Sequence, residues 1–360
     1  MNSPERDAVN SPERDAVNSP ERGTVGGPER DAASGRRPDA PVNGSAGAPR
    51  RPRLLVLRAL GLGDLLAGVP ALRALRRAFP GHETVLATPA ELAPLVRASG
   101  AVDTLLPASA PGRAVPAITG WHGPPPQIAV DLHGRGPESM RALAALSPGR
   151  LLAFAAEDGP RWYAEEHERD RWCRFLSWYG IPADPADLRL PPPPVACPAP
   201  GAVLLHPGAG SPARCWPVER YAAVAARLRH AGRRVVVTGG THEYDLLARL
   251  AKLAGLPDAD VHGEPPLERL AALVAGASAV VSGDTGVAHL AVAHGTPSVT
   301  LFGPVPPALW GPPPLERHRV LWHPGPPGDP HGRGPDPLLL RIRPEEVLEA
   351  LSLLPEVRAA

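Results

Sequence analysis

The chain has 360 residues, of which 50 are proline and 37 glycine, and 43% are hydrophobic. This length is typical of two domains of ordinary size, whereas the proline and glycine content indicates that part of the chain lies outside a folded core. The 38 basic and 37 acidic residues leave a formal net charge of +1. The nearly equal numbers of basic and acidic residues argue against a nucleic-acid-binding protein, which would need a clustered basic excess.

The cysteines and the apolar runs indicate the compartment. Cys173, Cys197 and Cys215 form no CxxC motif, so we predict neither a disulfide framework nor a metal site. No apolar run reaches the roughly 18 residues that span a bilayer, and the polar N-terminus is unlike a signal peptide. We therefore expect a cytoplasmic protein without a transmembrane segment; peripheral contact with the inner face of the cytoplasmic membrane is left open.

Residues 1–50 contain a repeat. The unit NSPERDAV begins at residue 2, recurs at residue 10, and returns with changes at residues 18 and 26. Its proline, serine, glutamate and arginine content offers too little apolar surface to offset the entropy lost on ordering. We predict a disordered tail and leave its role open.

The rest of the chain alternates short apolar runs with stretches of helical periodicity. In residues 51–182 we expect strands at 54–58, 84–87, 102–106 and 128–132, and helices at 65–78, 90–98 and 162–179. A proline-rich linker is expected at 183–200, and residues 201–360 repeat the strand–helix pattern and end in a closing helix. The fold class predicted is α/β, with two Rossmann-like, doubly wound domains facing each other across a cleft. Because ligands bind at the carboxyl ends of such strands, the strand-to-helix turns are the candidate sites.

The first of these turns contains Gly61, Gly63 and Asp64. A full GxGxxG fingerprint is absent because residue 66 is leucine, which counts against a nicotinamide-dependent dehydrogenase. Asp64 has two readings from spacing alone: a helix N-cap or a general base.

A second turn runs from His206 to Pro217 and includes Gly208, Ser211 and Arg214. Glycine-rich turns before a helix present backbone N–H groups to an anion, and arginine adds a bidentate fork for phosphate oxygens. The alternative is a surface arginine beside ordinary turn formers.

Two further turns lie in the same half of the chain. Asp284, Thr285 and Gly286 precede a helix that carries His289, and Glu243 follows a Gly-Gly pair. Two anion-receptive turns in one domain suggest a bound diphosphate, with Glu243 placed to bind ribose hydroxyls. Each also has a structural reading: helix caps at residues 284 and 285, a packed histidine, and a first-turn acid that opposes the helix dipole at Glu243.

Taken together, these motifs resemble glycosyltransferase family 9, the heptosyltransferase-like enzymes. The resemblance extends over roughly residues 53–354. The matching boxes are Gly63-Asp64 with Val69-Pro70-Ala71-Leu72, the Arg214-Cys215-Trp216-Pro217 box, residues 239–243, residues 281–290, and Thr300-Leu301-Phe302-Gly303-Pro304.

The resemblance implies a GT-B fold and an inverting, metal-independent transfer of a sugar, with ADP-heptose as the expected donor. The acceptor would be a glycan, a lipid-linked sugar or a small molecule. It implies that Asp64 is the general base, with Gly63 on the acceptor side, and that the C-terminal domain binds the donor. No cofactor and no metal ligand are expected. The donor residues that we predict are Gly208, Ser211, Arg214, Glu243, Asp284, Thr285, Gly286 and His289.

The sequence departs from the family pattern in two places. Where the family often has Thr-Asp-Pro after the phenylalanine box, this chain has Val305-Pro306-Pro307, and Arg214 stands where lysine is also found. The main alternative is a non-catalytic protein that binds nucleotide sugars; a dehydrogenase and a scaffold that acts through its repeat tail are weaker ones.

Overall fold

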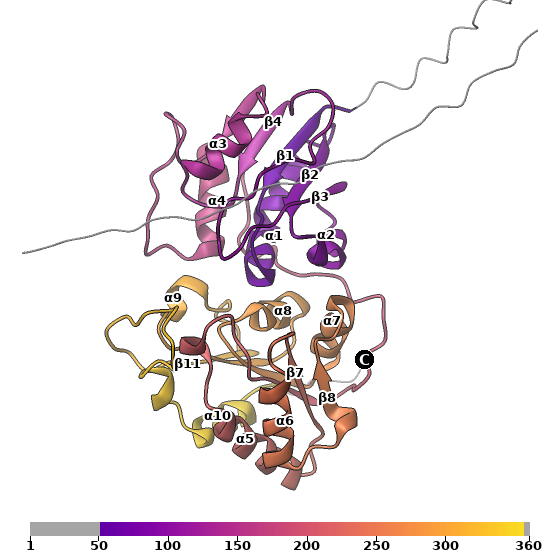
Figure 1. The fold of residues 1–360 in the computed structure, drawn as a ribbon, viewed down its shortest axis with the longest axis vertical. Coiled ribbons are helices and arrows are strands. Elements are labelled where there is room, and N and C mark those ends of the chain that lie inside the picture. Colours follow the sequence, from indigo (N-terminus) through magenta and orange to yellow (C-terminus); the bar gives the residue numbers. More distant parts are fainter. Residues whose placement is uncertain (1–50, 356–360) are drawn as a thin grey trace, which may run out of the picture. The chain divides into compact units, whose positions relative to one another are not determined.

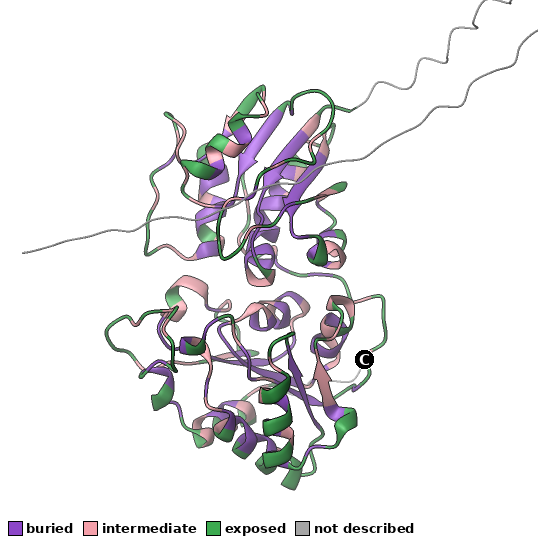
Figure 2. Ribbon diagram, viewed as in Figure 1, coloured by how far each residue is buried: buried purple, intermediate pink, exposed green. Residues whose placement is uncertain are grey.

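The structure is a computed structural model that describes residues 51–355, so the predicted disordered tail lies outside the described residues. The described residues, 51–355, belong to one compact unit. It contains two parallel sheets with helices packed on them (Figure 1). Both sheets are largely buried, whereas the outer faces of several helices are exposed (Figure 2).

The first sheet has the strand order β3-β2-β1-β4-β5 and is parallel throughout. Its central strand, β1, carries four consecutive buried aliphatic residues after Arg53. A strand that is apolar on both faces is what a sheet covered on two sides requires. The elements of this half are β1 (Arg53–Leu57), α1 (Leu62–Ala78), β2 (Glu83–Thr88), η1 (Ala90–Leu92), α2 (Ala93–Ser99), β3 (Thr104–Pro107), β4 (Ile128–Asp131), α3 (Glu138–Ala144), β5 (Arg150–Leu152) and α4 (Glu168–Trp178).

The second sheet has the order β11-β10-β9-β6-β7-β8 and is also parallel. The chain order reverses between the neighbours β6 and β9, as it does between β1 and β4 in the first sheet, so each sheet has a switch point where ligands bind. The elements are β6 (Val203–His206), η2 (Pro212–Arg214), α5 (Val218–His230), β7 (Val235–Gly239), α6 (Tyr244–Ala254), η3 (Asp258–Asp260), β8 (Val261–Gly263), α7 (Leu267–Gly276), β9 (Ala279–Gly283), α8 (Gly286–His294), β10 (Ser298–Leu301), α9 (Pro307–Trp310), β11 (His318–Leu321), η4 (Leu339–Arg341) and α10 (Pro344–Ser352).

The predicted α/β class and the long helices are confirmed, with two kinds of difference. The helix predicted from residue 162 begins only at Glu168. Five short elements without a clear period were not predicted: α3, β5, β8, α9 and β11. Between α4 and β6 the chain has neither helix nor strand, but it is held by contacts: Asp187 pairs with Arg73 (2.6 Å) and the Leu190 N–H donates to the Ala293 carbonyl (2.9 Å).

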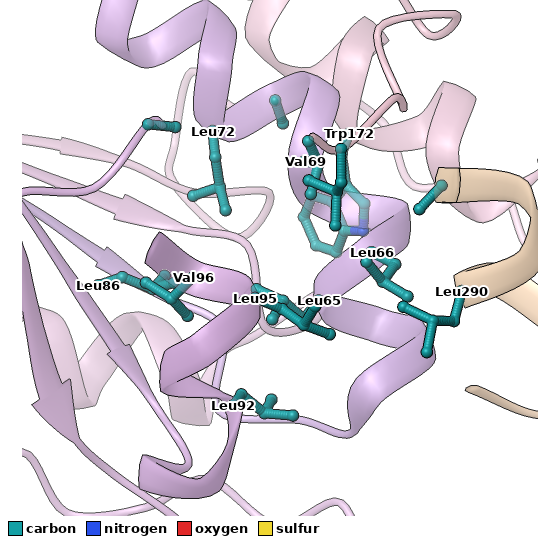
Figure 3. Packing of buried hydrophobic residues seen from close by; sticks show 14 of the residues in the cluster. Leu65, Leu66, Val69, Leu72, Leu86, Leu92, Leu95, Val96, Trp172 and Leu290 are labelled. Carbon is teal, nitrogen blue, oxygen red and sulfur yellow. The ribbon is translucent and has the colours of Figure 1, made fainter. Parts of the chain in front are cut away.

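One hydrophobic cluster joins residues of both halves. Leu66 and Val69 of α1 pack with Trp172 of α4 and with Leu290 of α8, and all four are at most 2% exposed (Figure 3). Helix α1 continues through Pro70, which lies in the middle of its sequence and is buried. This cluster places the first turn of α1 against α8, so the packing of apolar side chains sets the geometry of the polar site described next.

Candidate active site

The site begins where the N-terminal turns of α1 and α8 meet. A Cβ atom built on Gly63 would lie 2.9 Å from the Cδ2 atom of His289, and one built on Gly286 would lie 2.8 Å from the Leu62 side chain. Both distances are shorter than real Cβ contacts, so glycine is needed at both positions for the two turns to approach. The contact brings Asp64, three residues into α1, next to the turn that precedes α8.

Asp64 is buried and does not cap its helix. The N-cap of α1 is Gly61, so the N-cap reading of Asp64 is wrong. Both carboxylate oxygens accept hydrogen bonds from Arg113, from Nη2 to Oδ1 at 2.8 Å and from Nη1 to Oδ2 at 3.1 Å. The Arg113 side chain is 55% exposed whereas that of Asp64 is 9% exposed. The buried carboxylate is therefore covered by an arginine side chain that is itself in contact with solvent.

The charges around Asp64 keep it ionised. Burial alone would raise the pKa of this carboxyl group, but the positive charges of Arg58 and Arg113 outweigh burial and hold the pKa below its ordinary value. Burial lowers the pKa of the neighbouring His289 to about 4, although the Asp64 charge opposes this shift. At neutral pH the pair is therefore a carboxylate beside an uncharged imidazole.

Arg214 and Asp284 lie on the other side of the α8 turn. Arg214 ends the short helix η2, and its Nη1 atom donates to the Asp284 carbonyl oxygen at 3.4 Å and lies 4.0 Å from the Asp284 carboxylate. Gly283 has no side chain, and a Cβ there would lie 3.0 Å from the Arg214 carbonyl. The end of β9 and the loop after β6 thus come together at the switch point of the second sheet.

Two donor atoms at this switch point have no hydrogen-bond partner among residues 51–355: Nε of Arg214 and Oγ1 of Thr285, both buried. Thr285 is the N-cap of α8, yet its side chain makes no capping hydrogen bond. Buried polar atoms in proteins are nearly always paired. An arginine N–H, a hydroxyl and the free N–H groups of a helix start are together the donors that phosphate oxygens need.

Gly208 and Glu243 form a second contact group on the same sheet. Glu243 is the N-cap of α6 and accepts a hydrogen bond from the Gly240 N–H at 2.6 Å. A Cβ on Gly208 would overlap the Glu243 carboxylate, at 1.9 Å from Oε1. Ser211 is buried; its hydroxyl accepts from the Ala213 N–H and donates to the Gly332 carbonyl, each at 3.4 Å. The loop that carries Gly208 and Ser211 continues directly into Arg214.

The buried carboxylate of Asp284 is a source of pH-dependent instability. Burial raises its pKa to about 6, and Arg214 at 4.0 Å only partly opposes the shift. A raised pKa means that the folded state binds the proton more tightly than the unfolded chain, so stability falls as the pH rises from about 4 to about 6. Above that window the ionised group costs the folded state on the order of 3 kcal/mol.

We therefore expect Asp284→Asn to stabilise the protein by about 1–3 kcal/mol at pH 8 and by much less at pH 4. Urea unfolding curves at both pH values measure the difference. Asp158→Asn, on an exposed residue, serves as the control and should stay within about 0.5 kcal/mol of the wild type at both. A stabilisation by Asp284→Asn that is equal at pH 4 and pH 8 would contradict this account.

Sequence reasoning missed several residues of the site. Arg58 directly follows the first strand, and its position at a strand end was a usable signal. Arg113 lies in the irregular segment between β3 and β4, where no periodicity marks it. At the end of β4, Asp131 accepts hydrogen bonds from Ser139 (2.6 Å) and the His133 N–H (3.0 Å). Burial raises the Asp131 pKa to about 6.

Two further properties concern residues 51–355. None of the helices there is long and apolar enough to cross a membrane. No group of three or more histidine, cysteine, aspartate or glutamate side chains within that range is placed to hold a metal ion.

Comparisons with known proteins agree with this architecture. The model of the family described as glycosyltransferase family 9 (heptosyltransferase) matches residues 193–325. The chain is 28% identical over 295 residues to lipopolysaccharide heptosyltransferase 1 of Salmonella typhimurium, which covers 72% of this chain and 90% of that protein. It is 35% identical over 161 residues to lipopolysaccharide heptosyltransferase 2 of the same organism. That second alignment covers 42% of this chain and spans about half of the relative's length, 46%.

Among solved structures, an Escherichia coli heptosyltransferase with ADP aligns with a TM-score of 0.63 at 20% identity, covering 83% of this chain and 99% of the other. The two doubly wound sheets therefore have the GT-B fold that the resemblance implies. The comparisons also support the resemblance to glycosyltransferase family 9: residues 193–325 match its family model, and the chain is similar to lipopolysaccharide heptosyltransferases.

Proposed function

We propose that the protein transfers a sugar from a nucleotide-diphosphate sugar to a hydroxyl group of an acceptor, with Asp64 as the general base. The observation that carries the proposal is the contact between the first turns of α1 and α8, through Gly63 and His289. It brings an ionised carboxylate beside a turn whose buried donors suit phosphate oxygens. A base and a diphosphate site in contact are what a direct displacement at the sugar requires.

The chemistry follows from these positions. An Asp64 oxygen accepts the proton of the acceptor hydroxyl, the hydroxyl oxygen attacks the anomeric carbon, and the bond from that carbon to the β-phosphate oxygen breaks. Since this is one displacement, the configuration at the anomeric carbon inverts. The nucleoside diphosphate leaves with the bonding electron pair, and Arg214, Thr285 and the N–H groups at Gly286 are placed to stabilise its negative charge.

Arg113 has to leave the Asp64 carboxylate before a hydroxyl reaches it, because both carboxylate oxygens accept hydrogen bonds from its guanidinium. Its exposed side chain lies on an irregular segment, so a change of rotamer would suffice.

The donor we propose is ADP-heptose. Support comes from the relatives, which are named lipopolysaccharide heptosyltransferases, and from the structural neighbour that holds ADP. We propose that Glu243, which lies against Gly208 and Gly240 at the loop end of β7, binds the ribose hydroxyls. We propose that the reaction uses no metal ion, because Arg214 and the helix N-terminus supply the positive charge for the leaving group. We propose a glycan or a lipid-linked sugar as the acceptor.

The proposal is tested by measuring nucleotide release from ADP-heptose, ADP-glucose, UDP-glucose and GDP-mannose, each with and without EDTA. We expect ADP release from ADP-heptose, slow with water and unchanged by the chelator, and little from the UDP and GDP sugars. Tight nucleotide-sugar binding without release in the presence of candidate acceptors would instead favour the alternative of a non-catalytic binding protein. Loss of release in EDTA, restored by a divalent cation, would overturn the metal-free mechanism.

A further inference from the structure

We propose that Arg58 is a positioning residue that holds the backbone of Asp64 and keeps a fixed positive charge behind it, and that Glu168 in turn holds Arg58. The proposal rests on Asp64 as the base of the proposed function, and it adds two residues that lie behind the site.

Arg58 is completely buried, which is rare for an arginine. Its Nε atom donates to the Asp64 carbonyl oxygen at 2.6 Å, Nη1 donates to the Leu132 carbonyl at 2.5 Å, and Nη2 donates to the Glu168 carboxylate at 3.2 Å. One guanidinium therefore ties together the first turn of α1, the end of β4 and the start of α4. The rigid fork of arginine makes such a three-way contact, whereas the single ammonium of lysine does not.

The packing around Arg58 is built to fit it. A Cβ atom on Gly68, one turn further along α1, would lie 2.7 Å from Nε of Arg58, so the helix passes over the guanidinium only because residue 68 is glycine. The Arg58 Cζ atom lies 5.1 Å from the ring centroid of Trp172. That ring donates from Nε1 to the Glu168 carboxylate at 2.7 Å.

Glu168 is also buried, and both of its carboxylate oxygens accept hydrogen bonds. Its carboxylate accepts hydrogen bonds from Arg58, from Trp172 and from Arg171, which is itself buried. Keeping charges buried is costly unless every partner is present. Glu168 lies between Arg58 and Arg171, so its single negative charge does not cancel both arginines, and Arg58 still acts on Asp64 as a positive charge. Arg58 contacts Asp64 only through the backbone carbonyl. The Asp64 carboxylate is therefore left to face the site.

Four charged or titratable groups act on the Asp64 carboxylate. Arg58 follows β1, Arg113 lies between β3 and β4, His289 belongs to α8, and Asp284 precedes α8. Arg113 is half exposed and has to move for the reaction, and His289 is neutral at pH 7. Arg58 is therefore the buried cation that stays in place when Arg113 moves.

The test is a pH titration of the Asp64 side chain in the full-length protein labelled with ¹³C at the aspartate carboxyl carbons, with Asp64→Asn used to assign the signal. In the wild type we expect Asp64 to stay ionised to the acid limit of the folded state. In Arg58→Gln its midpoint should rise by about one pH unit or more, and Arg58→Lys, which keeps a charge but not the fork, should lie between the two.

Glu168→Gln separates positioning from general loosening of the fold. Glu168→Gln weakens the contacts that hold Arg58, as Arg58→Gln does, but it removes a negative charge instead of a positive one. The titration midpoint of Asp64 should therefore be unchanged or lower. An unchanged midpoint in Arg58→Gln, or an equal rise in Glu168→Gln, would overturn the proposal. The titration needs no substrate. If ADP-heptose proves not to be the donor, the proposed function fails while the assignment of Arg58 is still decided by the titration.

Discussion

Replacement of Asp64 by asparagine is expected to lower turnover with ADP-heptose by about 10²–10⁴-fold, the usual contribution of a general base. Asparagine has nearly the same shape and still accepts a hydrogen bond from Arg113 through its amide oxygen, but it does not take a proton. Because Asp64 does not lie among the donors that suit phosphate, the affinity for the nucleotide should change by less than about threefold. The measurement is ADP release at saturating donor, together with the dissociation constant for ADP.

The pH dependence adds a second check. Since Arg58 and Arg113 hold the Asp64 pKa below its ordinary value, loss of activity on acidification should begin only well below neutral pH. The control is Asp158→Asn, which changes an exposed residue that is not among the proposed site residues. This variant should retain wild-type turnover. If Asp64→Asn turned over within tenfold of the wild type, Asp64 would not be the general base.

Replacement of Arg214 by alanine is expected to weaken binding of ADP and ADP-heptose by about 10–150-fold, the loss of about 1.5–3 kcal/mol typical of a charged hydrogen bond. The guanidinium is held beside Asp284 with its Nε buried and without a partner among the described residues, so it is pre-organised for an anion. Removing it also leaves the Asp284 carboxylate without its nearby positive charge, which adds repulsion toward a diphosphate.

The matched control is Arg227→Ala, an exposed arginine in the last turn of α5. The C-terminal end of that helix lies away from the strand ends that carry the donor loops. This variant should bind ADP as the wild type does, which separates a local contact from a general loss of positive charge. An equal loss of affinity in both variants would show that Arg214 acts only through net charge.

The fold was largely predictable from the sequence, because its signals are local. The apolar strands at residues 54–57 and 279–282 and the long amphipathic helices between them have the length and spacing of a parallel α/β arrangement. The elements that were missed, such as β5 with three residues and β11 with four, are too short to show a period. They form through pairing with a neighbouring strand that no local pattern reveals.

The site was predictable only where a residue lies in a strand-to-helix turn. Asp64, Arg214 and Thr285 occupy such turns, and the structure brings them to the strand ends of the two sheets. Arg113 and Glu168 were out of reach, since each meets its partner across more than 40 residues of sequence: Arg113 pairs with Asp64, and Glu168 pairs with Arg58. Such long-range ion pairs depend on the finished fold and leave no pattern along the chain.

The measurement that tests the account most directly is calorimetric titration of the wild type, Asp64→Asn and Arg214→Ala with ADP-heptose, with UDP and GDP as competing nucleotides. The account predicts that the wild type and Asp64→Asn bind ADP-heptose with similar affinity, that Arg214→Ala binds it at least tenfold more weakly, and that UDP and GDP bind poorly. If the wild type does not bind ADP-heptose, or if Arg214→Ala binds it as tightly as the wild type, the donor site is not where we place it.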